Sequence, residues 1–375
     1  MIANQRHLFD IPDDVAYLNC SSHSPLLRKA FDAGQQAVMR KAHPWGSFRE
    51  DAAAECETLR GLFARLIGAA DRDIAIVPST AYGIATATLN LPVERGQKIV
   101  VLQDQFPSNY HAWVLLAHET GAELVTVARP KDGDWTSAVL ARIDGGTAIA
   151  ALPPCHWTDG SRVDLQPIGE RCRAVGSAFV IDATQACGAQ PIDVRALQPD
   201  FLAASGYKWL LCPYTLSFLY AAPHRQNGRS LEHHRTNSAN ERRALAEHDS
   251  VVSDGARRYD MGERNNPIGL PMAIAAIEQL LAWDPTQVSE TVKPLTDRIA
   301  ALAAERGFIV PPAAHRVPHI IGMRRPGGVP ADIDKRLAAE NVHISLRGDS
   351  IRVSPHVFNG LDEVDRLFAA LDRAL

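Results

Sequence analysis

Two stretches of the sequence decide the fold: AFVIDATQ at residues 178–185 and FLAASGYKWLL at residues 201–211. Each begins with an apolar run of strand length, and polar residues follow where the run ends. Strands that are apolar throughout are typical of a parallel sheet covered on both faces. Ligands bind at the carboxyl edge of such a sheet. We therefore expect Asp182, Gln185 and Lys208 to lie at that edge.

Further apolar runs of strand length recur on both sides of this pair. The expected strands are residues 74–78, 99–103, 123–127, 147–152, 178–182, 201–204 and 216–220. Helical spacing fills most of the intervals, at residues 51–67, 82–89, 110–120 and 165–175. This alternation predicts an α/β fold in which helices flank a mostly parallel, seven-stranded sheet.

The pattern changes after residue 225. Residues 225–258 are polar and loop-like, with one short helix expected at the centre, and a loop of this length is either functional or simply a mobile surface segment. Amphipathic stretches at 268–283 and 288–306, short strands and a last helix at 361–375 follow. We expect a large α/β domain over residues 15–255 and a small α+β domain formed by residues 1–14 and 256–375.

Composition restricts the class of protein. The chain has 375 residues, 46% of them hydrophobic, and a formal net charge of −4, which excludes a disordered chain and disfavours a nucleic-acid binder. Its six cysteines form no C-x-x-C pair, so neither a disulfide framework nor a metal site is expected. No apolar run reaches the roughly 18 residues of a membrane span. We expect a soluble cytoplasmic protein without a nucleic-acid or membrane partner.

Lys208 differs from the other six lysines, which lie in polar surroundings. It stands between two apolar runs, where desolvation lowers the pKa of an amine and makes it nucleophilic enough for a Schiff base. A lysine at a strand end can also extend its amine to water, and aspartates at strand ends are common. The combination of Lys208 with Asp182 is more specific, because pyridoxal 5′-phosphate needs both groups. The lysine holds its aldehyde, and the carboxylate keeps its pyridine nitrogen protonated.

The motifs DATQ at 182–185 and SGYK at 205–208 resemble those of the class V aminotransferase family of fold-type I pyridoxal-phosphate enzymes. This group includes kynureninases, isopenicillin-N-epimerase-like proteins and cysteine desulfurases. The resemblance extends from Tyr17 to the last helix. It implies a fold-type I architecture with a small C-terminal domain, pyridoxal 5′-phosphate on Lys208 and a homodimer.

The resemblance also implies cofactor contacts, residue by residue. The turn PSTA at 78–81 matches the family's phosphate cup, and free N–H groups at a helix N-terminus favour a dianion, although Ser-Thr at this position is also a common N-cap. Phe106 matches a ring that stacks on the cofactor, and Gln185 matches the residue that hydrogen-bonds its phenolic oxygen. Asn265 lies in a segment that reaches across the dimer. The expected cofactor-binding residues are Ser79, Thr80, Ala81, Phe106, Trp157, Asp182, Gln185, Ser205, Tyr207, Lys208 and Asn265.

Substrate recognition is expected at Arg352, in the segment IRVSPH at 351–356. It matches the arginine that grips the substrate's α-carboxylate, which a guanidinium can do through two parallel hydrogen bonds. Asn19 and His156 are the other expected substrate contacts. Either His156 or Trp157 takes part directly, or both only form the wall of the pocket.

The sequence also limits the reaction. A desulfurase needs a nucleophilic cysteine in the small domain, and no cysteine follows Cys212. The run FPS at 106–108 is closer to kynureninase. We expect an aminotransferase-like or C–C/C–S lyase reaction on a small α-amino acid, through an external aldimine and a Cα carbanion, with Lys208 and Asp182 as the catalytic residues. An epimerase of the same family and an inactive pyridoxal-phosphate sensor stay open as alternatives.

Overall fold

The structure of the chain is a computed structural model that describes residues 1–46, 48–239 and 251–375. Its largest element is a seven-stranded sheet, and each expected strand lies within one residue of its predicted limits. The strands are β2 (Ile74–Val77), β3 (Lys98–Leu102), β4 (Glu123–Val127), β5 (Thr147–Leu152), β6 (Ala178–Asp182), β7 (Phe201–Ser205) and β8 (Ser217–Ala221). These findings confirm the α/β class.

The sheet is mostly parallel, as predicted. Its order is β2-β8-β7-β6-β5-β3-β4, and β3, β4, β5, β6 and β7 pair in parallel. Strand β8 runs antiparallel to both of its neighbours, β7 and β2. Every residue of β6, β7 and β8 is buried, which explains why these strands read as continuous apolar runs.

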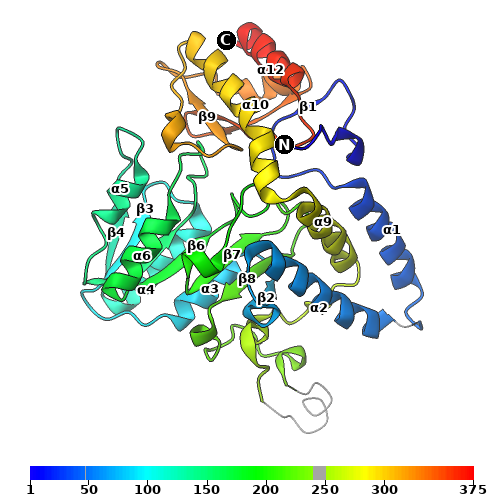
Figure 1. Cartoon of the computed structure of the whole chain (residues 1–375), viewed down its shortest axis with the longest axis vertical. Helices are drawn as coiled ribbons and strands as arrows, with labels where there is room; N and C mark the ends of the chain where they lie inside the picture. Colours follow the sequence, from blue (N-terminus) through cyan, green and yellow to red (C-terminus); the bar gives the residue numbers. More distant parts are fainter. Residues whose placement is uncertain (47, 240–250) are drawn as a thin grey trace.

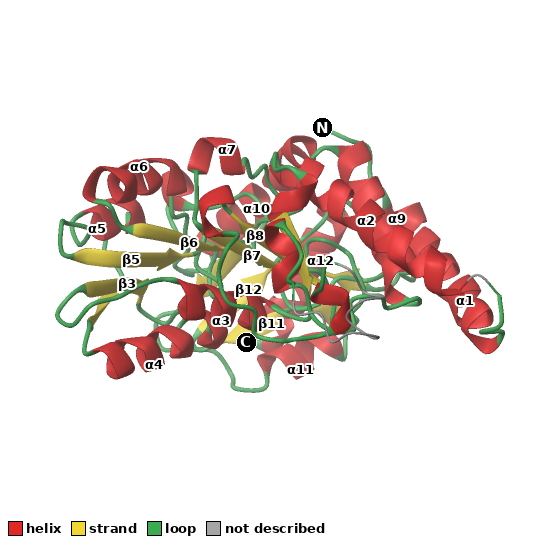
Figure 2. Ribbon diagram, turned by 90° about the horizontal axis from the view of Figure 1, so that it is seen from below, coloured by secondary structure: helices red, strands yellow, loops and turns green. Residues whose placement is uncertain are grey.

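Helices cover both faces of the sheet (Figure 2). Side chains of α3 and α4 pack on one face, and side chains of α2, α5, α6 and α9 pack in the core on the other. Helix α9 also contacts α1. The bounds of these helices and of α7, which lies next to α6, are α1 (Arg28–Ala42), α2 (Phe48–Ile67), α3 (Thr80–Asn90), α4 (His111–Thr120), α5 (Trp135–Leu140), α6 (Leu165–Val175), α7 (Val194–Leu197) and α9 (Gly269–Trp283).

Helix α6 shows how local signals set the limits of an element. Asp164 caps its first turn by accepting a hydrogen bond from the N–H of Gln166, at 3.2 Å. Gly176 ends the helix in the left-handed conformation, with φ 76°. Both signals can be read from the sequence, and the helix has the limits that were predicted, 165–175.

A second core lies at the C-terminal end of the chain, at the top of Figure 1. Strands β11, β12 and β9 form an antiparallel sheet in that order, and β1 pairs in parallel with β10. No helix in the described ranges is long and apolar enough to cross a membrane. The bounds are β1 (Ala16–Tyr17), α10 (Pro285–Glu305), β9 (Ile321–Arg324), α11 (Ile333–Ala338), β10 (Val342–His343), β11 (Ser345–Arg347), β12 (Ser350–Val353) and α12 (Leu361–Ala374).

Side-chain packing crosses the predicted domain limits at residues 15 and 255. Ala16 and Leu18 lie in the second core, whereas α9 packs on α1 and α2 in the first. The predicted limits rest on changes in local sequence pattern. The two cores are instead formed by contacts between segments far apart in the sequence, which a local pattern does not reveal. The centre of the expected loop at 225–258, residues 240–250, lies outside the described residues.

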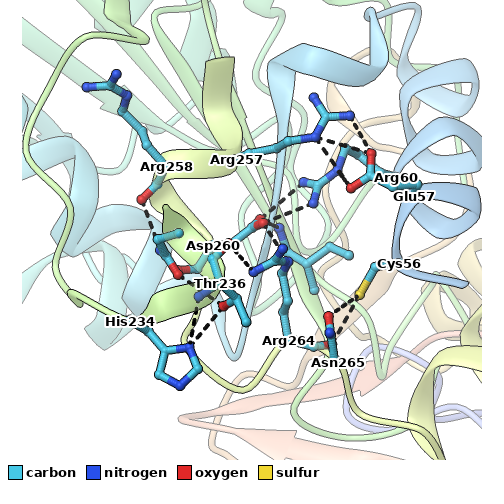
Figure 3. A network of polar contacts seen from close by, with 12 residues as sticks. Cys56, Glu57, Arg60, His234, Thr236, Arg257, Arg258, Asp260, Arg264 and Asn265 are labelled. Carbon is cyan, nitrogen blue, oxygen red and sulfur yellow. Dashed lines mark hydrogen bonds and ion pairs between the residues drawn. The ribbon is translucent and has the colours of Figure 1, made fainter. Parts of the chain in front are cut away.

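A buried ion pair holds the segment after that loop against the sheet (Figure 3). The Asp260 carboxylate accepts hydrogen bonds from Arg60 on α2, at 3.1 and 2.9 Å, and from the backbone N–H of Ile76 on β2, at 2.7 Å. Arg264 lies 3.1 Å from the same carboxylate. Both Arg60 and Asp260 are fully buried, so each charge depends on the other.

The Asp260→Ala variant tests this dependence. It leaves the Arg60 guanidinium buried without its carboxylate, and we expect the free energy of unfolding to fall by about 3–5 kcal/mol. Equilibrium denaturation measures the change. Glu57→Gln is the matched control, because Glu57 contacts the same arginine from a half-exposed position, and its effect should stay within about 1 kcal/mol. Equal effects of the two variants would contradict the assignment.

Candidate active site

A cavity of about 220 Å³ opens at the carboxyl edge of the sheet. Its wall comes from the segments that follow β2, β3, β5, β6 and β7. All the expected cofactor-binding residues except Asn265 lie in this wall: Ser79, Thr80, Ala81, Phe106, Trp157, Asp182, Gln185, Ser205, Tyr207 and Lys208. Parallel pairing of β5, β6 and β7 brings their following segments to one edge.

Hydroxyl groups gather at the N-terminus of α3. The Thr80 hydroxyl lies 2.7 Å from that of Thr184 and 2.8 Å from that of Ser205. Ser79 caps the helix by accepting from the N–H of Tyr82 at 3.2 Å. The first N–H groups of a helix have no partner within it, so hydroxyls and N–H groups together can receive a phosphate here. Sequence reasoning missed the role of Thr184, although it lies within the DATQ motif.

Lys208 and Asp182 are both buried in this wall. Burial lowers the pKa of Lys208 to about 8; Asp182 opposes this shift, and Arg352 and Arg347 add to it. Burial also raises the pKa of Asp182, although hydrogen bonds from Thr184 act in the opposite direction. The amine therefore has a substantial neutral fraction near neutral pH, as a nucleophile that attacks an aldehyde requires.

An aromatic wall faces the amine. Lys208 Nζ lies 5.1 Å from the centre of the Phe106 ring, and this ring meets Trp157 edge-on at 5.4 Å. The Trp157 indole donates to the backbone oxygen of Asp104 at 2.7 Å, which fixes its orientation. A flat ligand ring can stack on Phe106 within reach of the lysine.

Gln185 is held more firmly than the sequence indicated. Its Oε1 accepts from the Trp209 indole at 2.9 Å, and its Nε2 donates to the backbone oxygen of Ser21 at 3.0 Å. An amide NH₂ has two hydrogens, so one donor of Gln185 stays available to a ligand oxygen. The predicted hydrogen bond from Gln185 to the phenolic oxygen of pyridoxal 5′-phosphate would use this donor.

Arg352 lies behind Trp157 and is almost fully buried. Its guanidinium donates to the oxygen of Trp157 at 2.8 Å, to Ser22 Oγ at 2.8 Å and to Ser345 Oγ at 3.1 Å. Burial, with a contribution from Arg347, lowers its pKa to about 9. In the part of the chain that the structure describes, Arg352 has no carboxylate partner. Arg347 was not among the expected site residues.

Four expected residues lie outside the cavity wall: Arg352, described above, and His156, Asn19 and Asn265. His156 stacks on Trp135 at 5.4 Å, and its ring nitrogens contact the oxygen of Gln103 and the Thr158 hydroxyl. Asn19 Nδ2 donates to the oxygen of Ile344, and Asn265 Oδ1 accepts from Cys56 Sγ. Within one chain, therefore, these residues are not brought to the cavity, and their direct roles stay predictions.

The cavity fits pyridoxal 5′-phosphate on the geometry of its own groups. The α3 N-terminus can take the phosphate, Phe106 the ring, Asp182 the ring nitrogen and Lys208 the aldehyde. With the sheet that carries it, this arrangement defines a fold-type I pyridoxal-phosphate enzyme. The sequence matches the family described as aminotransferase class-V over residues 24–367, and the chain belongs to that family.

Curated relatives of this chain carry different activities. It is 25% identical over 376 residues to an uncharacterized aminotransferase of Bacillus subtilis, and 26% identical over 378 residues to isopenicillin N epimerase of Streptomyces clavuligerus. Each match covers 96% of this chain and 94% of the relative. The family relationship thus extends over nearly the whole chain, whereas the reaction differs among its members.

Solved structures share the fold at lower identity. The cysteine desulfurase CsdA of Escherichia coli superposes with a TM-score of 0.87 at 20% identity, covering 98% of this chain and 97% of that one. A C-DES variant with glycine covalently linked to its PLP cofactor superposes with a TM-score of 0.88 at 16% identity, and the match covers 98% of both chains. At these identities the likeness concerns the fold alone.

The lowered pKa of Lys208 leads to a pH prediction. Only the neutral amine attacks the aldehyde, so the rate at which the cofactor-free protein takes up pyridoxal 5′-phosphate should rise with pH, with its midpoint near about 8. Stopped-flow absorbance above about 400 nm follows the uptake. Asp182→Asn removes the group that raises this pKa and should move the midpoint lower, whereas Asp13→Asn, at an exposed carboxylate, should not. A midpoint near the ordinary 10.5 would show that Lys208 is solvated.

Proposed function

We propose that this enzyme removes the Cα proton of a small α-amino acid and completes either a transamination or a C–C or C–S bond cleavage. The observation that carries the proposal is the buried Lys208 amine, with its pKa of about 8, beside the Asp182 carboxylate. Bound pyridoxal phosphate would supply an electron sink for the charge that develops at Cα. Arg352 is the candidate to hold the α-carboxylate, because a guanidinium binds a carboxylate through two parallel bonds.

Lys208 is the base in this proposal. Its Nζ is the amine in the cavity wall whose pKa lies close to working pH, where general bases are most effective. The Asp182 carboxylate would stabilise the protonated form of the cofactor's pyridine nitrogen. Phe106 and Trp157, on the aromatic wall, carry no group that titrates near neutral pH. Transamination and elimination can proceed with Lys208 as the one base, whereas a reaction that needs proton donors on both faces of Cα requires a second group.

Epimerisation stays the second candidate. It is favoured by the full-length relationship to isopenicillin N epimerase, at 26% identity. This reaction returns a proton to the opposite face of Cα and thus needs a second donor. Tyr207 and Tyr214 are phenols in the cavity wall, and burial raises the pKa of Tyr207 to about 12, so it keeps its proton at neutral pH. The sensor alternative requires a chain that binds the cofactor without turning over any amino acid.

Persulfide chemistry is not part of the proposal. All six cysteines are buried free thiols. Cys155 lies in the cavity wall, where burial raises its pKa well above the usual range, so it is not a thiolate at neutral pH. C–S bond cleavage that uses no protein thiol stays compatible with the site.

We also propose a homodimer, with a cytoplasmic location as a further prediction. Phe31, Val38 and Met39 are exposed on one face of α1 at helical spacing, and Trp45 is exposed just beyond that helix. An apolar face of this kind supports contact with another protein surface. Gly262–Asn265 lies outside the cavity of its own chain, which supports a contact with the neighbouring site instead.

An amino-acid panel tests the reaction. With the holoenzyme, we expect at least one amino acid to give Cα deuterium exchange together with pyridoxamine phosphate and a keto acid, or with ammonia and a cleaved side chain. Lys208→Ala should lower the exchange rate at least about 100-fold, and Lys293→Ala, at an exposed lysine, should not. Exchange that requires Lys208 but gives neither product would eliminate both favoured reactions in favour of epimerisation. A cofactor-loaded protein that exchanges no amino acid would support the sensor alternative.

Sedimentation tests the dimer. We expect a particle of twice 40.8 kDa with an interface of at least about 2,000 Å². Phe31→Asp combined with Met39→Asp places two charges in the proposed interface and should shift the equilibrium to monomer. Leu361→Asp, at an exposed leucine of α12, is the control. A wild-type monomer with full activity would refute the proposal.

A further inference from the structure

A second cavity lies beside the first, and the proposed function gives it no role. Its volume is about 490 Å³, and Trp157 lies in the walls of both cavities. Three arginines line it: Arg129, Arg324 and Arg347. A side chain that extends from the first cavity past Trp157 would enter this space.

Arg347 and Arg352 converge on one neutral oxygen. The NH2 nitrogens of the two guanidinium groups donate to Ser22 Oγ, at 2.9 and 2.8 Å. The two guanidinium carbons lie 6.0 and 5.9 Å from the centre of the Trp157 ring. Two like charges this close, one of them almost fully buried, destabilise each other unless negative charge lies close to each of them. The site is therefore built to receive negative charge.

The acidic residues of the second cavity do not neutralise these charges. Asp159 pairs with Arg129. Asp104 and Asp349 are exposed, and across residues 1–46, 48–239 and 251–375 they form no ion pair with Arg324 or Arg347. Asp334 favours the charged form of Arg347 from a distance without pairing with it. Arg347 thus faces the second cavity without a carboxylate partner in the described ranges.

We propose that the second cavity binds the substrate's side chain and that Arg347 pairs with an anionic group at its end. The substrate is then an α-amino acid with two negative groups: an α-carboxylate held by Arg352 and a distal anion held by Arg347. A dicarboxylic amino acid is the simplest member of this class. This inference rests on the proposed function and narrows its substrate class.

Paired amino acids test the inference in the holoenzyme. Dissociation constants of aspartate against asparagine, and of glutamate against glutamine, are measured from the change in cofactor absorbance. Each acid should bind at least about tenfold more tightly than its amide, because a charge-assisted bond to the guanidinium replaces a neutral one. The same ratio of dissociation constants is measured for O-phosphoserine against serine and for cysteate against asparagine. Comparing these ratios with that of aspartate against asparagine shows whether phosphate or sulfonate is preferred to carboxylate.

Variants of Arg347 test whether this residue causes the preference for acids over amides. Arg347→Gln should bring the acid-to-amide ratio close to one, and Arg347→Lys should keep part of it, because an ammonium keeps the charge but loses the fork of donors. Arg325→Gln removes an exposed charge beside β9 and should leave the ratio unchanged. Arg352→Gln should instead weaken the binding of acids and amides alike.

The outcomes separate this inference from the function on which it rests. Tight binding of neutral amino acids with no preference for any acid, or a preference that survives Arg347→Gln, would overturn the role of Arg347 and leave the proposed reaction in place. A holoenzyme whose absorbance responds to no amino acid would overturn both.

Discussion

The two neighbouring cavities and Arg352, which contacts Trp157 in the wall of both, carry more positive than negative charge. Lys208, Arg347 and Arg352 act on one another there, with Asp182 as the buried carboxylate in the first cavity. Burial and the two arginines together make the Lys208 amine easier to deprotonate. The same excess charge is costly without an anionic ligand. One electrostatic condition thus lowers the pKa of the lysine amine and favours an anionic ligand nearby.

The order and direction of the strands place Asp182 and Lys208 close together. Because β6 and β7 are parallel neighbours, Asp182 and the segment after Ser205 reach the same edge. The chain then turns sharply into the antiparallel strand β8, and Gly206 donates to the backbone oxygen of Leu216 at 3.0 Å. A Cβ on Gly206 would lie 2.2 Å from that oxygen, so only glycine permits this close approach. Lys208 is held in the cavity wall by this turn.

The relatives show that the fold by itself does not set the reaction. A desulfurase of 20% identity shares the fold with a TM-score of 0.87, and a curated epimerase matches over nearly the full length. The fold is therefore the common scaffold, and sharing it does not fix the reaction. Trp157 lies in the walls of both cavities, Arg347 lies in the wall of the second, and Ser22 accepts hydrogen bonds from Arg347 and Arg352. These residues lie on segments that follow β5, form β11 and precede α1.

The sequence by itself determined the strands, the limits of α6 and the placing of Asp182 and Lys208 at one edge of the sheet, because these depend on local periodicity, capping residues and neighbouring strand ends. Only the tertiary structure decided that β8 runs between β7 and β2, that His156 stacks on Trp135 outside the cavity, and that Arg347 meets Arg352. Ser22 and Arg347 are 325 positions apart in the chain. Contacts at such separations leave no trace in local sequence, because the folding of the whole chain brings the two segments together.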